Sequence, residues 1–217
     1  MRRKLINWLG LTGVVALLSY TAAVVLSPQA YPGYNWMTQA VSDLSASTAP
    51  SRVLWDQLAA PYGTCSVVCA TCVAIWVSEH KVGSRAFRVG IYLFTLMNWA
   101  SKLGYGMFPL SEAGTGMSTF QDLMHVYVVT AGVVLLSIAS LATIIVSGRQ
   151  SPELRRLSAW AAMALAMMFV GAVGQGVVPP SLFGVVERFS VFAAVGFNAV
   201  LGIWLFRQCD EGCCKPA

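Results

Sequence analysis

Residues 126–147 read VYVVTAGVVLLSIASLATIIVS, an apolar run without a single charged side chain. About 20 such residues in a helix are enough to cross the hydrocarbon core of a bilayer, which is roughly 30 Å thick. Because lipid offers no hydrogen-bond partners, the backbone of such a run must satisfy its own polar groups. The stretch therefore predicts a membrane-spanning α-helix.

The composition of the whole chain agrees with this prediction. Of the 217 residues, 57% are hydrophobic and 11% are charged, whereas soluble domains carry about 25% charged residues. The net charge of +5 could suggest nucleic acid, but the basic residues are scattered through short connections and form no stripe mixed with aromatic residues. We therefore expect a lipid bilayer around the protein and no nucleic-acid partner.

Five other segments share the length and apolar character of the first. The predicted spans cover residues 5–27, 54–78, 87–108, 120–147, 157–178 and 184–206. The first follows Met-Arg-Arg-Lys as a signal peptide would, but it is longer than a signal's apolar region and no small-x-small cleavage site follows it. The connections are too short to fold alone, so we predict one all-α domain over 1–217, a six-helix transmembrane bundle with a short tail at 207–217.

The lysines and arginines indicate the orientation of this bundle. Of the 14 basic residues, only Arg52, Lys102 and Arg188 lie at or near the side opposite the two termini. The positive-inside rule assigns the basic side to the cytoplasm. We therefore predict a multi-pass protein of the inner (cytoplasmic) membrane with both termini in the cytoplasm.

The longest connection, residues 28–54, is expected on the extracytoplasmic side. Within it Met37, Val41 and Leu44 share one helical face, which predicts a short amphipathic helix lying along the membrane or over the bundle. In the span that follows, Pro61 removes a backbone donor and predicts a kink.

Ionisable side chains at membrane depth are costly and usually mark function. Nearly all those near the span edges fall on the extracytoplasmic side, at Asp43, Asp56, Lys102, Glu112, Asp122, His125, Glu187 and Arg188. On the third span Asn98 and Lys102 are four residues apart and could face the same interior. As a set, these residues predict a polar site at the outer end of the bundle.

Spacing also suggests which of these residues meet. Asp122 and His125 are three residues apart on one helix face, where the carboxylate could orient or charge the imidazole. Glu187 and Asn198 follow one stripe of the last span, so both could line a single cavity. Glu187 would also stand at a helix start, where the helix dipole stabilises an anion.

Metal and redox chemistry stay open but have weaker support. His80 is predicted in a cytoplasmic connection, far from His125, so a metal site would have to combine His125 with carboxylates. Three cysteines, Cys65, Cys69 and Cys72, share one face of the second span, a spacing more typical of helix packing than of copper binding. Three more, Cys209, Cys213 and Cys214, lie in the tail. The sequence leaves the cofactor unknown.

Four short motifs follow one another along the six-span pattern: YPGYNWMTQAVSDLSA at 31–46, FPLSEAGTG at 108–116, DLMH at 122–125 and VVERF at 185–189. In their order they resemble a prokaryotic integral membrane family, domain of unknown function 998. The positions that carry the resemblance are Ser42, Asp43, Leu44, Phe108, Pro109, His125, Glu187 and Arg188. The resemblance implies the same bundle and the same outer cluster, and it names no reaction.

Our leading hypothesis is a binding or sensing role, in which an outer cavity holds a lipid headgroup or a small amphipathic ligand. Its lining would come from Asp43, Lys102, Asp122, His125, Glu187 and Arg188, whose mixed charges suit such a headgroup. A third-ranked alternative is a small ion-coupled transporter that uses Lys102 and Glu187. Six helices could form such a carrier as a homodimer.

The second-ranked alternative is an intramembrane hydrolase of a lipid or acyl bond. His125 would act as the base, with Asp122 or Asp43 orienting it. The attacking group would be Ser42 or a metal-bound water.

Overall fold

The computed structural model describes residues 3–111 and 119–208, and within these ranges the chain is helical and contains no strand. The helices are α1 (Leu5–Gly10), α2 (Thr12–Leu26), α3 (Arg52–Glu79), α4 (Arg85–Met107), α5 (Phe120–Leu123), a π-helix (Met124–Thr130), α6 (Ala131–Gly148), α7 (Arg155–Val177) and α8 (Phe183–Arg207). Short 3-10 helices occur at Ser27–Ala30, Ser42–Ser45, Pro152–Leu154 and Pro180–Leu182. The predicted all-α class is confirmed.

Five helical stretches are long and apolar enough to cross a membrane: Leu5–Ala30, Arg52–Glu79, Phe120–Gly148, Pro152–Val177 and Pro180–Arg207. They make the chain a multi-pass membrane protein, and their exposed faces carry large apolar side chains such as Leu18, Leu135 and Val173. Outward-facing apolar side chains suit a helix surrounded by lipid rather than water. The predicted span at 87–108 corresponds to α4, which is not among these five stretches because Asn98, Ser101 and Lys102 make it more polar.

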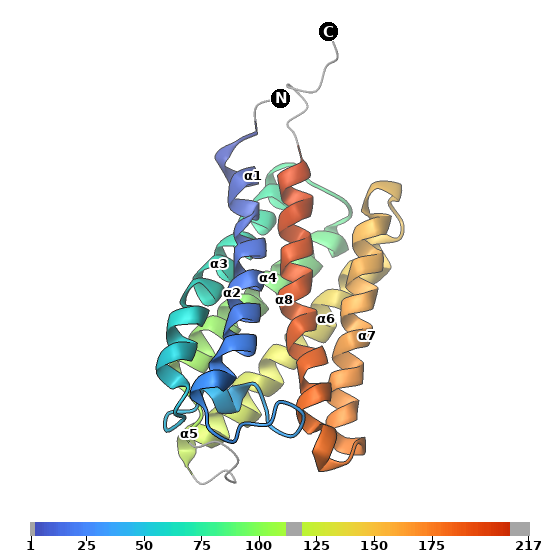
Figure 1. The fold of residues 1–217 in the computed structure, drawn as a ribbon. Coiled ribbons are helices and arrows are strands. Elements are labelled where there is room, and N and C mark those ends of the chain that lie inside the picture. The colour runs from blue at the N-terminus through green and yellow to red at the C-terminus, as the bar shows by residue number, and fades with distance from the viewer. Residues whose placement is uncertain (1–2, 112–118, 209–217) are drawn as a thin grey trace.

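The long helices form a closed ring in the order α2, α3, α4, α6, α7 and α8 (Figure 1). The first and the last of them, α2 and α8, pack against each other, and α8 also contacts α3. At the centre, Phe94 of α4 meets Phe197 of α8 edge to face, with ring centroids 5.2 Å apart. The core is therefore shared by helices from both halves of the chain.

The two ends of the bundle are built differently (Figure 1). We call one the termini end, because α1 begins there and α8 ends there, beside the α3–α4 and α6–α7 connections. Asn7 donates to the Leu205 carbonyl at 3.1 Å and Arg3 to the Phe206 carbonyl at 2.9 Å, which ties α1 to α8. The opposite end, the loop end, carries residues 27–51, the end of α4, the start of α5 and the α7–α8 connection.

The amphipathic helix expected around Met37, Val41 and Leu44 is not formed, so this prediction was wrong. Residues 36–39 form turns, and a 3-10 helix covers only Ser42–Ser45. The backbone carbonyls that an α-helix would use internally are instead bound by α8, since the Gly184 N–H donates to Met37 and Arg188 donates to Trp36. Tertiary contacts have overridden the periodic pattern.

Pro61 lies inside α3, and the helix continues through it with help from α2. The Ser19 hydroxyl donates to the Leu58 carbonyl at 2.6 Å and accepts from the Tyr62 N–H at 3.1 Å. A side chain inserted into the ladder in this way replaces the backbone bond that the proline disturbs. These two hydrogen bonds fix the position of α2 along the axis of α3.

Candidate functional site at the loop end

Residues 31–46 form a segment that lies against the first turns of α8 at the loop end, and we call it the cover segment. Its contact with α8 is built around Arg188, whose Nη1 donates to the carbonyls of Trp36 at 2.7 Å and Gly184 at 2.6 Å. Arg188 Nη2 donates to the Tyr34 hydroxyl at 2.8 Å, and that hydroxyl donates to the Ala40 carbonyl at 2.8 Å. One guanidinium thus ties together several turns of the cover segment.

Gly184 allows the backbones of the cover segment and α8 to touch. Its N–H donates to the Met37 carbonyl at 2.8 Å. A Cβ atom at this position would lie 2.3 Å from the Gln39 oxygen and 2.4 Å from the Trp36 oxygen, both of them backbone atoms. Only glycine fits at such a separation.

Two carboxylates hold consecutive amides of the cover segment. Glu187 Oε2 accepts from the Val41 N–H at 2.8 Å, and Asp43 Oδ2 accepts from the Ala40 N–H at 3.1 Å. Asp43 is buried, at 7% exposure. The structure therefore brings Asp43, Glu187 and Arg188 to one place, as the sequence analysis expected, and each of them binds the backbone of the cover segment.

An aromatic cluster fills the space beneath Val41. Tyr20 of α2 contacts the rings of Trp55, Tyr62 and Phe192 at centroid distances of 5.9, 4.7 and 5.5 Å. Val41 is 2% exposed and packs into this cluster. The cover segment is thus seated on α2, α3 and α8 by apolar burial as well as by hydrogen bonds.

Asp122 and His125 lie in a second group, where the chain enters α5. Asp122 Oδ2 accepts from the Thr119 hydroxyl at 2.7 Å and from its N–H at 3.2 Å, and Oδ1 accepts from the Ser111 N–H at 2.9 Å. This is a capping box, in which the carboxylate closes the start of the helix. The structure gives Asp122 these partners in place of the expected His125.

The His125 ring is held by the end of α4. Its Nδ1 lies 2.7 Å from the Phe108 carbonyl oxygen, and the ring centroid lies 4.9 Å from that of Tyr105. Because a carbonyl can only accept, Nδ1 carries the proton, and Nε2 is the basic nitrogen of the neutral ring. His125 also stands in the π-helix, a rare element that often occurs at functional sites.

The remaining predicted residues at this end take separate positions. Lys102 is exposed and extends along α3, with its Nζ 2.9 Å from where a Cβ on Gly63 would stand. Ser42 is half-buried in the short 3-10 helix of the cover segment. Ser47 directly follows the cover segment, and its N–H donates to the Leu110 carbonyl at 2.9 Å. This bond links the cover segment to the residues that follow α4. Glu112 lies outside the described residues.

Asn98 and Asn198 meet deeper in the bundle, around Ser66 of α3. The Ser66 hydroxyl donates to Asn98 Oδ1 at 2.6 Å and accepts from Asn198 Nδ2 at 3.0 Å. Asn198 Nδ2 also lies 3.2 Å from the Ser66 carbonyl. All three side chains are buried, so they form a polar bridge between α3, α4 and α8 and do not line a cavity with Glu187.

A surface groove of about 280 Å³ lies beside Arg188. Its walls are apolar side chains of α7 and α8, with Trp36 of the cover segment and Arg188 at its edge; the lining residues are Trp36, Met167, Val185, Arg188, Phe189 and Phe192. Arg188 Cζ is 5.9 Å from the Trp36 ring centroid, a cation–π distance. The groove thus combines an apolar wall with one cation.

The residues that the sequence offered for metal or redox chemistry do not gather into one group in the described part of the chain. Among the described residues, no group of three or more His, Cys, Asp or Glu side chains could hold a metal ion. Cys65, Cys69 and Cys72 are free thiols, and Cys69 donates weakly to the Asn198 carbonyl at 3.5 Å. The tail cysteines Cys209, Cys213 and Cys214 lie outside the described residues.

The sequence patterns did not single out Tyr34, Trp36 and Gly184 of the loop end, nor Ser66 deeper in the bundle. The first two lie inside the YPGYNW motif, and Gly184 directly precedes VVERF, so proximity to those motifs could have drawn attention to them. Ser66 is an ordinary serine in an apolar helix, and nothing in its neighbourhood marks it.

Comparisons with known proteins bear on the family alone. A family model described as "Protein of unknown function (DUF998)" matches residues 14–204. No curated protein and no solved structure matches the chain.

Proposed function

The chain belongs to the DUF998 family, and we propose that it is a six-span protein of the inner (cytoplasmic) membrane that binds or senses an amphipathic ligand at its loop end. The observation that carries the proposal is the groove beside Arg188, in which apolar side chains of two membrane-spanning helices meet a single guanidinium. Sites for amphipathic molecules need this pairing of an apolar wall with a few polar groups.

Besides the five apolar stretches, the span that completes the proposed six is α4, at the predicted position 87–108. It has 23 residues, about 34 Å at 1.5 Å per residue, and it packs between α3 and α6. It also carries the chain from the termini end, where α3 finishes, back to the loop end, where α5 begins (Figure 1). A chain whose neighbouring segments both cross the bilayer needs such a return passage.

The proposed orientation has the termini end in the cytoplasm. That end carries most of the basic residues, including Arg85, Arg88, Arg149 and Arg155, and positive charge is retained on the cytoplasmic side. The loop end with the cover segment would then face the extracytoplasmic side.

The chemistry of the groove favours an anionic or zwitterionic amphiphile. Val185, Phe189 and Phe192 would contact an acyl chain, and Arg188 would meet a phosphate or carboxylate. A guanidinium has five N–H donors, and the bonds to Trp36, Gly184 and Tyr34 do not use all of them. A ligand that draws on Arg188 would also compete with its bonds to the cover segment, which offers a route from binding to a structural response.

The test is a thermal-shift titration of the purified protein with a short-chain phosphatidylglycerol. Saturating ligand should stabilise the wild type, by about 2.7 kcal/mol at a concentration 100 times Kd. Val185→Phe fills the groove and should abolish the shift, whereas Val173→Phe, the same change on an exposed face of α7, should keep it. Equal shifts in all three proteins would rule out this groove as the binding site.

A hydrolase remains the second candidate because the bond to Phe108 leaves Nε2 of His125 as a base. Turnover of a fluorogenic phospholipid that His125→Gln abolishes, or zinc that co-purifies and is lost in this variant, would promote that candidate. Equal turnover in wild type and variant would retire it. Ion-coupled transport through Lys102 and Glu187, with or without dimerisation, stays a prediction that a liposome flux assay would decide.

A further inference from the structure

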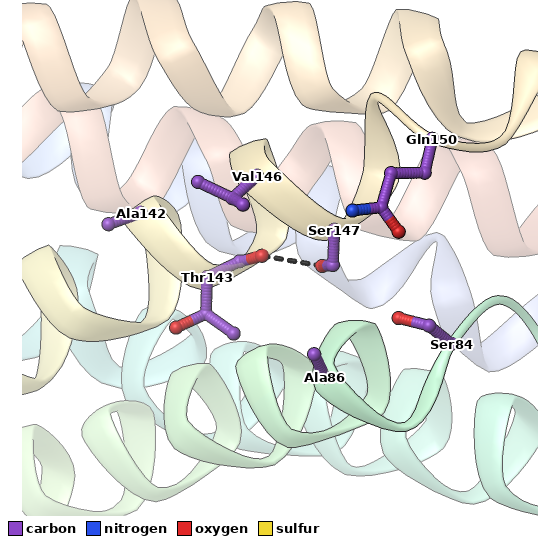
Figure 2. A pocket seen from close by; sticks show the side chains of 7 residues that line it. All are labelled: Ser84, Ala86, Ala142, Thr143, Val146, Ser147 and Gln150. Atoms are coloured by element: carbon purple, nitrogen blue, oxygen red, sulfur yellow. Dashed lines mark hydrogen bonds between the residues drawn. The ribbon is translucent and has the colours of Figure 1, made fainter.

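A second groove lies at the other end of the molecule, between α4 and α6 at the termini end. Its volume is about 370 Å³, within the range of small-molecule sites. On one side it is lined by Ser84, the N-cap of α4, and by Ala86 of α4 (Figure 2). On the other side it is lined by Ala142, Thr143, Val146 and Ser147 of α6, and by Gln150 just beyond the end of α6. None of these residues belongs to the loop-end site.

The lining changes character along the groove. Ala86, Ala142 and Val146 line one part together with Thr143, whose hydroxyl donates to the Ala139 carbonyl within α6. Ser84 and Gln150 line the part toward the termini end (Figure 2). The hydroxyl of Ser147 is occupied within α6, where it donates to the Thr143 carbonyl. The groove therefore has an apolar part and, nearer the termini end, a part with hydrogen-bonding side chains. We call the second part, lined by Ser84 and Gln150, the mouth.

Two arginines are chain neighbours of the polar lining residues at this end of the groove. Arg85 stands in the chain between the lining residues Ser84 and Ala86, and Arg149 directly precedes Gln150. Both arginines are exposed. Basic pockets between transmembrane helices bind the headgroups of anionic lipids.

We infer that this groove is a binding site for an anionic phospholipid. An acyl chain lies against Ala86, Ala142 and Val146, and the phosphate lies at the mouth beside Arg85 and Arg149. The small side chains let the acyl chain approach the backbones of α4 and α6, and the two arginines favour an anionic headgroup. The inference does not depend on the loop-end site, because the two grooves share no residue.

A second copy of the protein fits this groove less well. A two-fold symmetric contact places each patch against itself, so Arg85 and Arg149 would meet the same arginines of the partner. Repulsion between these like charges would oppose association of two copies. The same arginines would attract an anionic headgroup. Charge complementarity therefore favours the lipid.

The test uses native mass spectrometry of the full chain released from nanodiscs of equimolar phosphatidylcholine and phosphatidylglycerol. Each basic residue at a membrane surface contributes about a fivefold preference for anionic lipid, so wild type should retain phosphatidylglycerol at least about fivefold over phosphatidylcholine. Ala142→Leu fills the groove and should lose the retained lipid. Ala166→Leu, the same change on an exposed position of α7, should keep it.

A second pair of variants separates charge from shape. Arg85→Gln with Arg149→Gln should keep a bound lipid but lose the preference for phosphatidylglycerol, whereas Arg155→Gln with Arg156→Gln, exposed arginines near the same end, should keep the preference. Wild type without a preference, or equal retention in Ala142→Leu and Ala166→Leu, would overturn the inference. A dimer mass that Ala142→Leu abolishes would also overturn it, because the groove would then hold a second copy.

Discussion

Glu187 accepts a hydrogen bond from the Val41 N–H at 2.8 Å, across 146 residues of chain. Its neighbour Arg188 donates to the carbonyl of Trp36 in the same segment. The two neighbouring side chains thus bind backbone groups of opposite polarity. The Glu187 carboxylate accepts from an N–H, and the Arg188 guanidinium donates to a C=O. Together they clamp the cover segment to the first turns of α8.

The clamp gives a direct prediction for Glu187. Glu187→Ala removes the acceptor of the Val41 N–H, and a hydrogen bond to a charged group contributes about 1.5–3 kcal/mol. Glu187→Gln keeps an acceptor oxygen in place and should lose less. Hydrogen exchange at the Val41 amide should be fastest in the alanine variant, intermediate in the glutamine variant and slowest in wild type. Identical exchange in all three would show that this bond does not hold the segment.

Gly184→Ala should destabilise the protein although alanine is the better helix former. The added Cβ would stand 2.3 Å from a backbone oxygen of Gln39, so the cover segment must move away. Gly196→Ala, in the same helix, meets no atom within 4 Å and should instead stabilise by up to about 1 kcal/mol. Thermal unfolding in one detergent compares the two, and a shift of the same sign in both variants would contradict the close contact.

Ser66→Ala should weaken the bundle more than its small size suggests. The change removes one hydrogen-bond partner each from Asn98 Oδ1 and Asn198 Nδ2 in a buried site. Leaving a buried polar group without its partner costs about 1–3 kcal/mol in proteins generally. A hydrogen bond between membrane helices contributes about 0.6 kcal/mol on average. Ser137→Ala is the matched control, since the buried Ser137 hydroxyl binds only within its own helix, at Val133. The free energy of unfolding of both variants measures the bridge, and equal losses would deny it.

Tyr34 should resist ionisation. Burial raises the pKa of its phenol above the ordinary value of 10.0, and the bond from Arg188 only partly offsets this rise. Because the unfolded chain releases this proton at lower pH than the folded protein, stability should fall as pH rises above about 10. Spectrophotometric titration of wild type against Tyr34→Phe isolates this group, and an ordinary pKa for Tyr34 would mean that the hydroxyl faces water.

Hydropathy was sufficient to predict where the helices lie, because lipid leaves the backbone no alternative to helix formation. The predicted segments at 120–147 and 184–206 agree with the described helices to within a few residues. In the cover segment, where water and protein can satisfy the backbone, the same kind of pattern failed. The apolar spacing of Met37, Val41 and Leu44 reflects the burial of Val41 and Leu44 and does not indicate an α-helix.

Pairing at the site could be predicted only in part. Charge and depth brought Asp43, Glu187 and Arg188 together correctly, because such groups gather where water reaches the bundle. Their partners turned out to be backbone amides and carbonyls, which every residue carries and no sequence pattern marks. The spacing of Asp122 and His125 was right for contact, yet the capping of α5 claimed the carboxylate.

The packing of α2 against α8 closes the ring with the first and the last long helices of the chain. During synthesis α2 can pack on α3 at once, but the ring cannot close until α8 has been translated. Over that interval Ser66 already stands in α3, while Asn198, which completes its polar bridge, has yet to be translated. A nascent chain that stops before α8 would keep the Ser66–Asn98 hydrogen bond between α3 and α4 but would lack Asn198, which covers that pair in the complete bundle.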